Sequence, residues 1–92
     1  MATLTPEQVA REIAATPGWQ VSDGQLTRTV TLKDFRDALL FVNAVGFLAE
    51  RAEHHPDIDI SWNAVTLTLV THSEGGLTEK DFDLARQIND LG

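Results

Sequence analysis

Apolar and polar residues alternate along residues 58–69, where every second position is hydrophobic on both sides of a short polar interruption. The apolar positions are Ile58, Ile60, Trp62, Val65, Leu67 and Leu69. A period of two is typical of strands with one buried face. A turn at Asn63-Ala64 places both apolar sets on the same side of a hairpin. We therefore expect two antiparallel strands here.

A second hairpin is indicated earlier in the chain by the turn sequence Asp23-Gly24. This residue pair readily adopts the positive φ angles that both central positions of a type I′ turn require. Pairing outward from the turn sets Val21 against Leu26. Residues 19–30 therefore have one partly apolar face.

Three segments begin with the polar pattern of a helix N-terminus. In each, a Thr is followed three residues later by Gln or Asp, and apolar residues flank the pair. The three pairs are Thr5 with Gln8, Thr31 with Asp34, and Thr78 with Asp81. The Thr oxygen of such a capping box accepts an unpaired backbone N–H, and the apolar residues set the direction in which the chain enters the helix. We expect the middle helix to cover residues 33–53.

The elements follow one another in the order helix, hairpin, helix, hairpin, helix. This order favours an α+β fold in which helices cover one face of an antiparallel sheet. Independent domains usually contain about 50–200 residues, and no linker or low-complexity segment divides the chain. We expect a single domain spanning residues 1–92.

The middle helix is unusual because apolar residues cover its whole circumference. Between residues 38 and 49 only Asn43 is polar, whereas a helix that lies on one sheet needs only an apolar stripe. The stretch is too short to cross a bilayer, which takes about 20 apolar residues. A small chain has few elements with which to enclose such a helix. We therefore expect self-association through it, in preference to burial within one chain.

Charge and cysteine content exclude several classes of function. Fourteen acidic residues against seven Lys and Arg give a net charge of −7, which disfavours binding to nucleic acid or to an anionic membrane. The absence of cysteine excludes disulfides, thiolate metal sites and cysteine nucleophiles. No basic segment leads into an apolar run at the N-terminus. We therefore expect no secretory signal and a cytoplasmic location.

All histidines of the chain lie in its second half, as the pair His54-His55 and as His72. Histidine can donate or accept a proton near neutrality because its unperturbed pKa is about 6.5. The pair ends the middle helix and His72 ends the last strand, so the second hairpin brings them toward the same end of the sheet. Two carboxylates stand nearby in the expected fold: Glu50, four residues before His54, and Asp81 at the start of the last helix.

Two further features bear on a cleft at this end of the sheet. Gly75-Gly76 would let the backbone approach a ligand closely, since glycine has no side chain. His72, however, has the strand parity of Thr66 and Thr68. Its side chain therefore points away from the apolar face, unless the strand ends before it.

Each candidate residue also has a structural interpretation. Histidines interact favourably with the dipole at a helix C-terminus, and Glu50 with His54 could form a surface i, i+4 pair. Asp81 has a role in its capping box. Three histidines and a carboxylate can bind zinc, but neighbours on a helix point about 100° apart. We therefore expect His54 and His55 not to share a metal ion.

Together these residues resemble the pterin-4a-carbinolamine dehydratase family over nearly the whole chain. The matching motifs are Glu50-x-x-x-His54-His55-Pro56, Thr71-His72 and Asp81. The resemblance implies a four-stranded antiparallel sheet with three helices on one face, in the order α-β-β-α-β-β-α, and assembly into homodimers or homotetramers. It also implies a hydro-lyase without metal or cofactor. Such an enzyme removes water from 4a-hydroxytetrahydropterin, its substrate, to give quinonoid dihydropterin in tetrahydrobiopterin biosynthesis and recycling.

The resemblance also assigns the site residues: catalytic His54, His55 and His72, and supporting or substrate-binding Glu50, Thr71 and Asp81. Expelling hydroxide from C4a needs a proton on the leaving oxygen, and the N5 proton must be removed. We expect His54 and His55 to divide these two transfers, in either order, and His72 to orient the substrate or to hold the hydroxyl. Glu50 is expected to hold the tautomer of His54, and Asp81 that of His72. The alternative is a non-catalytic dimerisation or protein-binding module on the same fold.

Overall fold

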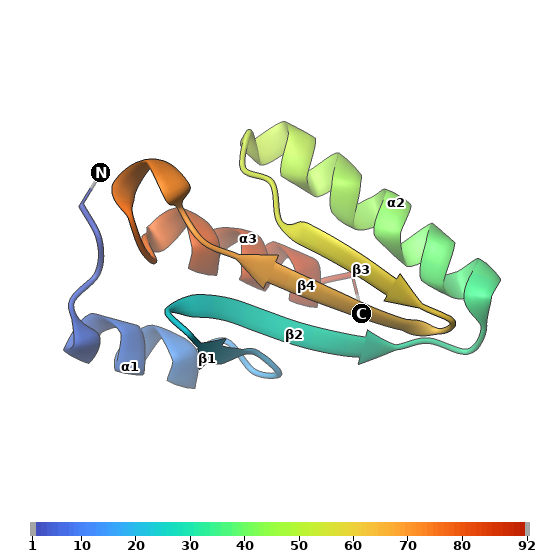
Figure 1. Ribbon diagram of the computed structural model, residues 1–92, viewed down its shortest axis with the longest axis horizontal. Coiled ribbons are helices and arrows are strands. Elements are labelled where there is room, and N and C mark those ends of the chain that lie inside the picture. Colours follow the sequence, from blue (N-terminus) through green and yellow to red (C-terminus); the bar gives the residue numbers. More distant parts are fainter. Residues whose placement is uncertain (1, 92) are drawn as a thin grey trace.

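The computed structural model describes residues 2–91 and contains the elements expected from the sequence (Figure 1). The helices are α1 (Pro6–Ala14), α2 (Phe35–Ala52), the short 3-10 helix η1 (His72–Glu74) and α3 (Glu79–Asn89). The strands are β1 (Gln20–Ser22), β2 (Gln25–Thr31), β3 (Asp57–Ser61) and β4 (Ala64–Leu69). The predicted order α-β-β-α-β-β-α is confirmed, with η1 as an additional single turn.

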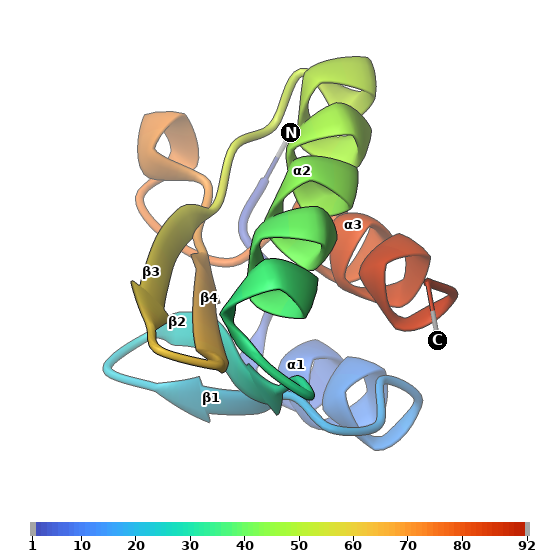
Figure 2. The same cartoon turned by 90° about the vertical axis from the view of Figure 1, so that its right-hand side faces the viewer.

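The strands form one four-stranded sheet in the order β1-β2-β4-β3, in which all neighbours are antiparallel. Helices α1, α2 and α3 lie on the same face of this sheet, as Figure 2 shows with the strands on the left and the helices on the right. The predicted α+β architecture, with its helices on one face, is therefore confirmed.

The core lies between the sheet and the helices. Its fully buried side chains come from Leu26 of β2, from alternate positions of β4 and from the inner faces of α2 and α3. They include Leu26, Val65, Leu67, Leu69, Val45, Phe82, Leu84 and Ile88. Removing apolar surface of this kind from water is the main stabilising contribution in folding. The core therefore holds α2 and α3 at defined positions on the sheet.

The first hairpin has the predicted register. Val21 pairs with Leu26, and both turn residues have positive φ, 53° at Asp23 and 73° at Gly24. These signs are those of the type I′ turn that the Asp-Gly pair favours. The first hairpin is thus specified locally, by its turn residues.

The predicted turn of the second hairpin is wrong by one residue. Ser61 pairs with Ala64, so Trp62 and Asn63 form the turn. Ala64 stays in β4 because it also pairs with β2, and the backbone oxygen of Asn63 accepts the N–H of Leu32 at 2.8 Å. The register therefore shifts by two residues, which keeps the apolar side chains on one face.

Two of the three predicted helix caps are confirmed. They are the capping boxes of Thr5 with Gln8 and of Thr78 with Asp81. The third is wrong, because Asp34 is the N-cap of α2 and its side chain accepts the backbone N–H of Asp37 at 2.8 Å. Thr31 is the last residue of β2 and is held by sheet pairing, so the helix begins only at Phe35.

Helix α2 has a buried face and an exposed apolar face. Ala38, Val45 and Ala49 are buried, whereas Leu40 and Phe47 are exposed, Phe47 by 70%. The expectation that the elements of one chain do not enclose this helix is therefore confirmed. Within residues 2–91, no helix is both long and apolar enough to span a membrane.

Candidate active site

The histidine pair follows the C-terminus of α2, which ends in a Schellman motif. The N–H of Glu53 donates to the carbonyl of Glu50 at 3.2 Å, and that of His54 donates to the carbonyl of Ala49 at 3.1 Å. Glu53 has a φ of 52°, in the left-handed region that Gly usually occupies at this position. The helix thus ends before His54, and helical i, i+4 spacing does not describe where the two imidazole rings point.

His54 points inward, to the N-terminus of α3. Its Nε2 lies 2.6 Å from Oδ1 of Asp81, and the two side chains are 11% and 0% exposed. Asp81 was expected to hold His72, and that prediction is wrong. The reason is the turn at the end of α2, which directs His54 against the capping residue of α3.

Two buried threonines complete the environment of Asp81. Its Oδ2 accepts the hydroxyl of Thr71 and the backbone N–H of Thr78, each at 2.9 Å. The hydroxyls of Thr71 and Thr78 lie 2.8 Å apart. Asp81 therefore caps α3 and contacts His54 at the same time, so its structural and functional interpretations are not alternatives. Thr71 supports the carboxylate that orients the histidine.

His55 points outward and pairs with Glu50. Its Nε2 lies 2.6 Å from Oε2 of Glu50, and the two side chains are 62% and 79% exposed. Glu50 was expected to hold His54, so this prediction is also wrong. The left-handed turn at Glu53 carries the chain back, so that the second histidine of the pair approaches the last turn of α2.

His72 does not have to point away from the apolar face with Thr66 and Thr68, because β4 ends before it. The strand finishes at Leu69, Thr71 forms an isolated bridge with Gly76, and His72 opens the helix η1. The alternation of side-chain directions along a strand therefore does not determine where the His72 side chain points. It is exposed, on the loop between β4 and α3.

The three histidines line one cavity of about 290 Å³. Its walls come from the end of α2 and from the loop after β4, namely Glu53, His54, His55, Val70, Thr71, His72, Ser73 and Lys80. The structure thus brings together His54, His55, His72 and Thr71. Asp81 and Glu50 are not among the residues that line the cavity, and each contacts one ring: Asp81 that of His54 and Glu50 that of His55. Four of the lining residues were not singled out from the sequence, although each is a direct neighbour of a predicted site residue: Glu53, Val70, Ser73 and Lys80.

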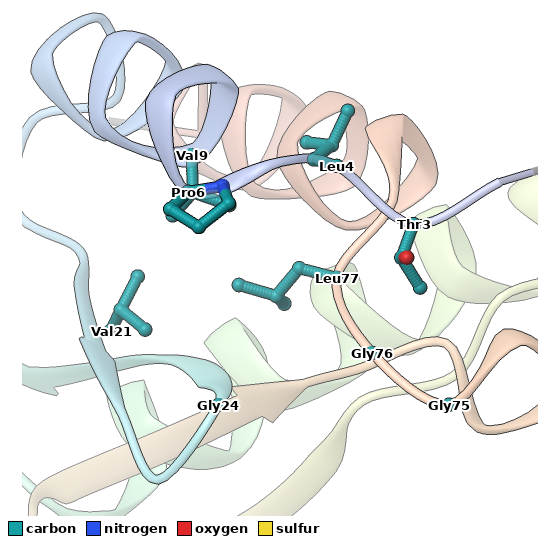
Figure 3. A pocket seen from close by; sticks show the side chains of 9 residues that line it. All are labelled: Thr3, Leu4, Pro6, Val9, Val21, Gly24, Gly75, Gly76 and Leu77. Carbon is teal, nitrogen blue, oxygen red and sulfur yellow. The ribbon is translucent and has the colours of Figure 1, made fainter.

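A second, more apolar cavity lies nearby and contains none of the predicted catalytic residues. It measures about 410 Å³ and is bounded by the start of α1, the first hairpin and the loop before α3 (Figure 3). Gly75 and Gly76 line this cavity, not the one that the histidines share. The expectation that these glycines admit a ligand near the histidines is therefore not supported.

The geometry leaves one nitrogen of each paired ring for a ligand. An ionised carboxylate only accepts hydrogen bonds, so His54 and His55 donate from Nε2 to Asp81 and Glu50. In the neutral ring Nδ1 then carries the lone pair, and in the imidazolium it carries a proton. Such rings can accept a proton at Nδ1 and return it. No three His, Asp or Glu side chains are grouped as metal ligands within residues 2–91.

The chain is similar to known proteins over nearly all of its described length. The family model described as pterin 4 alpha carbinolamine dehydratase matches residues 2–91. Curated relatives named "Putative pterin-4-alpha-carbinolamine dehydratase" include one from Acidobacterium capsulatum, 50% identical over 91 residues that make up 99% of each chain. Another, from Nocardia farcinica, is 51% identical over 88 residues, 96% of this chain and 93% of the relative.

Solved structures of proteins described as a pterin dehydratase and as pterin dehydratase-like have a similar fold. A protein described as a transcriptional coactivator/pterin dehydratase, from Brucella melitensis, superposes with a TM-score of 0.92 at 37% identity and covers 97% of both chains. A pterin dehydratase-like protein described as a RuBisCO assembly factor in the alpha-carboxysome has a TM-score of 0.66 at 22% identity, covering 79% of this chain and 84% of the other. The second likeness shows the fold alone. By its sequence over residues 2–91, its fold and its full-length relatives, the chain belongs to the pterin 4 alpha carbinolamine dehydratase family.

Proposed function

We propose that the protein is a 4a-hydroxytetrahydropterin dehydratase that works by proton transfer through histidine side chains. The observation that carries this proposal is the single cavity lined by His54, His55 and His72. Membership of the dehydratase family supports the same reaction. The biological role that follows is tetrahydropterin recycling in the cytoplasm.

The reaction requires two proton transfers. The C4a–O bond breaks as the oxygen receives a proton and leaves as water, and the N5–H bond gives up its proton as the N5=C4a double bond forms. Groups that titrate near neutrality suit both steps. One of the two rings, His54 or His55, starts as the imidazolium and gives its Nδ1 proton to the leaving oxygen. The other starts neutral and takes the N5 proton at Nδ1, while a carboxylate orients each ring. His72, on the opposite wall, orients the substrate at its hydroxyl.

The two ring–carboxylate pairs differ in solvent exposure, and this difference suggests a division of labour. His54 and Asp81 are nearly enclosed, so their geometry is held by packing and by the threonines. His55 and Glu50 are open to water, so His55 can exchange its proton with solvent between turnovers. We assign the proton transfer that needs a fixed geometry to the enclosed pair, and the transfer whose proton is renewed from solvent to the exposed pair.

The test is dehydration of chemically generated carbinolamine, followed by absorbance with and without the protein. Wild-type protein is expected to accelerate the reaction, and His55→Ala to lose most of the gain, about 10²-fold, because a positioned acid or base contributes that much. Arg36→Ala, an exposed change at the start of α2, serves as the control and is expected to keep full activity. Unchanged activity in His55→Ala would refute the assignment.

We propose further that the reaction needs no metal and no cofactor, since two histidines and the substrate suffice for the two proton transfers. Protein treated with EDTA and then desalted is expected to retain its full dehydration rate. Loss of activity that returns on adding a divalent metal would contradict this proposal. A control incubation without EDTA accounts for losses during handling.

The exposed apolar face of α2 supports self-association into homodimers or homotetramers. Leu39, Leu40 and Phe47 project from it without cover from residues 2–91. Exposed apolar patches of this kind commonly mark protein–protein contact surfaces. We propose that a second copy covers this face.

A second candidate function is a protein-binding module without catalysis. The similar Brucella melitensis protein is described as a transcriptional coactivator as well as a pterin dehydratase, which favours keeping this candidate. It predicts wild-type protein that does not accelerate dehydration but binds a defined protein partner. The carbinolamine assay on the wild type therefore separates the two.

A further inference from the structure

A hollow away from the histidines contains an arginine that forms no ion pair with a carboxylate of residues 2–91. It measures about 430 Å³ and is lined by Pro17, Gly18, Arg28 and Asn89; we call it the Arg28 hollow. Arg28 pairs with Leu67 in the sheet and therefore projects from the face that the helices cover. Its guanidinium reaches the C-terminal end of α3, where Asn89 is the last residue of the helix.

Asn89 holds the guanidinium in one orientation. Its Oδ1 accepts a hydrogen bond from Nη1 of Arg28 and a second one, of 2.8 Å, from the indole Nε1–H of Trp19. Its Nδ2 donates to the carbonyl of Pro17 at 3.0 Å. Because all three contacts agree on which amide atom is oxygen, the amide cannot rotate without losing them. Arg28 is thus positioned before any ligand arrives.

The backbone at Gly18 leaves room for this guanidinium. A Cβ at Gly18 would lie 3.1 Å from Nε and 3.2 Å from Cζ of Arg28. These separations are shorter than ordinary van der Waals contact, so a side chain there would push the guanidinium away by a few tenths of an ångström. Gly18 also has a φ of 87°, which other residues rarely adopt. The loop between α1 and β1 is therefore shaped to the arginine.

No carboxylate of residues 2–91 balances the charge of the hollow. Although acidic residues outnumber Lys and Arg by two to one, no carboxylate of residues 2–91 forms an ion pair with Arg28. Arg86 shows the contrast, since it contacts Glu12 at 2.8 Å and Asp83 at 3.0 Å. A guanidinium has five N–H donors, and Asn89, a neutral group, takes one from Arg28.

We propose that the Arg28 hollow binds the carboxylate of a small organic acid. The planar fork of a guanidinium matches a carboxylate, which it can bind through two parallel hydrogen bonds. Among the described residues that line the hollow, Arg28 is the one cation, so the site accommodates a single negative group. Pro17 and Gly18 offer a neutral surface to the rest of the ligand. This site is independent of the proposed dehydratase reaction.

Acetate is a suitable probe, and the two tryptophans provide the signal and its internal control. In a nitrogen–proton correlation spectrum, the indole N–H of Trp19 reports on the hollow because it shares its acceptor with Arg28. The indole of Trp62 lies in the turn between β3 and β4. Acetate added at constant ionic strength is expected to shift the Trp19 signal saturably and to leave the Trp62 signal in place. Acetamide is expected to shift neither.

Variants decide whether Arg28 is responsible. Arg28→Gln is expected to abolish the saturable shift, and Arg28→Lys to weaken binding about tenfold, since lysine keeps the charge but lacks the fork. Arg36→Gln, which removes an equal charge from an exposed site on α2, is expected to bind acetate like the wild type. An unchanged Trp62 signal shows that each variant is folded.

Three results would overturn the proposal. The first is a shift that grows linearly with acetate and never saturates, and the second is a saturable shift that persists in Arg28→Gln. The third is a Trp19 signal that moves with protein concentration in the absence of acetate, because a carboxylate of a second copy would then occupy the hollow.

Discussion

Asp81 shows how one residue combines a structural and a chemical role. It is fully buried, and its two oxygens accept hydrogen bonds from the His54 ring, the Thr71 hydroxyl and the Thr78 backbone. A buried carboxylate is tolerated when such partners replace water. The same bonds that stabilise the start of α3 therefore hold the imidazole ring at the cavity wall.

Asp81→Asn is expected to destabilise the protein by about 1–3 kcal/mol, because an amide cannot accept all three bonds and leaves a buried polar group unsatisfied. It is also expected to lower kcat, since His54 loses the acceptor that orients its ring. Urea unfolding and the carbinolamine assay measure the two effects.

Asp83→Asn is the matched control, because Asp83 is exposed and lies two residues away on the same helix. Loss of its contact with Arg86 is expected to change stability by less than about 1 kcal/mol, as for other surface ion pairs. Equal unfolding midpoints for the two variants would show that Asp81 has no special place in the structure.

At the scale of elements, the end of α2 decides the geometry of the site. Glu53 adopts a left-handed conformation, which costs a residue with a side chain roughly 1–2 kcal/mol. The turn at Glu53 sends His54 inward and His55 outward. Strain of this kind is found at functional sites, where the surrounding structure maintains it.

Glu53→Gly is expected to raise the stability of the protein by up to about 1 kcal/mol, because glycine adopts this conformation without a steric penalty. Ala44→Gly, inside the same helix, is expected to lower it by about 1 kcal/mol. Thermal unfolding followed by circular dichroism compares the two. A destabilised Glu53→Gly variant would mean that the glutamate side chain stabilises the turn more than its backbone strains it.

At the scale of the whole molecule, the sheet holds α2 with an apolar face outward. This face adjoins no element of residues 2–91, although the interior of the fold is well packed. A chain of this size buries a smaller share of its surface on folding than a larger domain does. Association of copies through α2 would bury the remainder.

Phe47→Glu is expected to dissociate the assembly, since it places a charge at the most exposed of the large apolar side chains. Ala10→Glu adds the same charge to an exposed position of α1 and is expected to leave the assembly intact. Light scattering coupled to size-exclusion chromatography gives the masses. A monomeric wild-type protein at micromolar concentration would contradict self-association through this helix.

Local patterns were sufficient for most of the fold. The turn at Asp23-Gly24 and the capping boxes at Thr5 and Thr78 depend on contacts between near neighbours in the chain, so they could be predicted from spacing. The errors occurred where a distant strand intervenes. Thr31 and Ala64 pair with each other in the sheet, and this pairing moved both the start of α2 and the turn of the second hairpin.

By itself, the sequence determined the order of elements, the apolar surface of α2 and the set of histidines and carboxylates available for chemistry, because these follow from residue type and spacing. Only the tertiary structure decided which carboxylate contacts which histidine. His54 meets Asp81 across a separation of 27 residues, and helix packing, not spacing along the chain, sets that contact. The Arg28 hollow has the same origin, since its residues come from a loop, a strand and a helix end that only the folded core brings together.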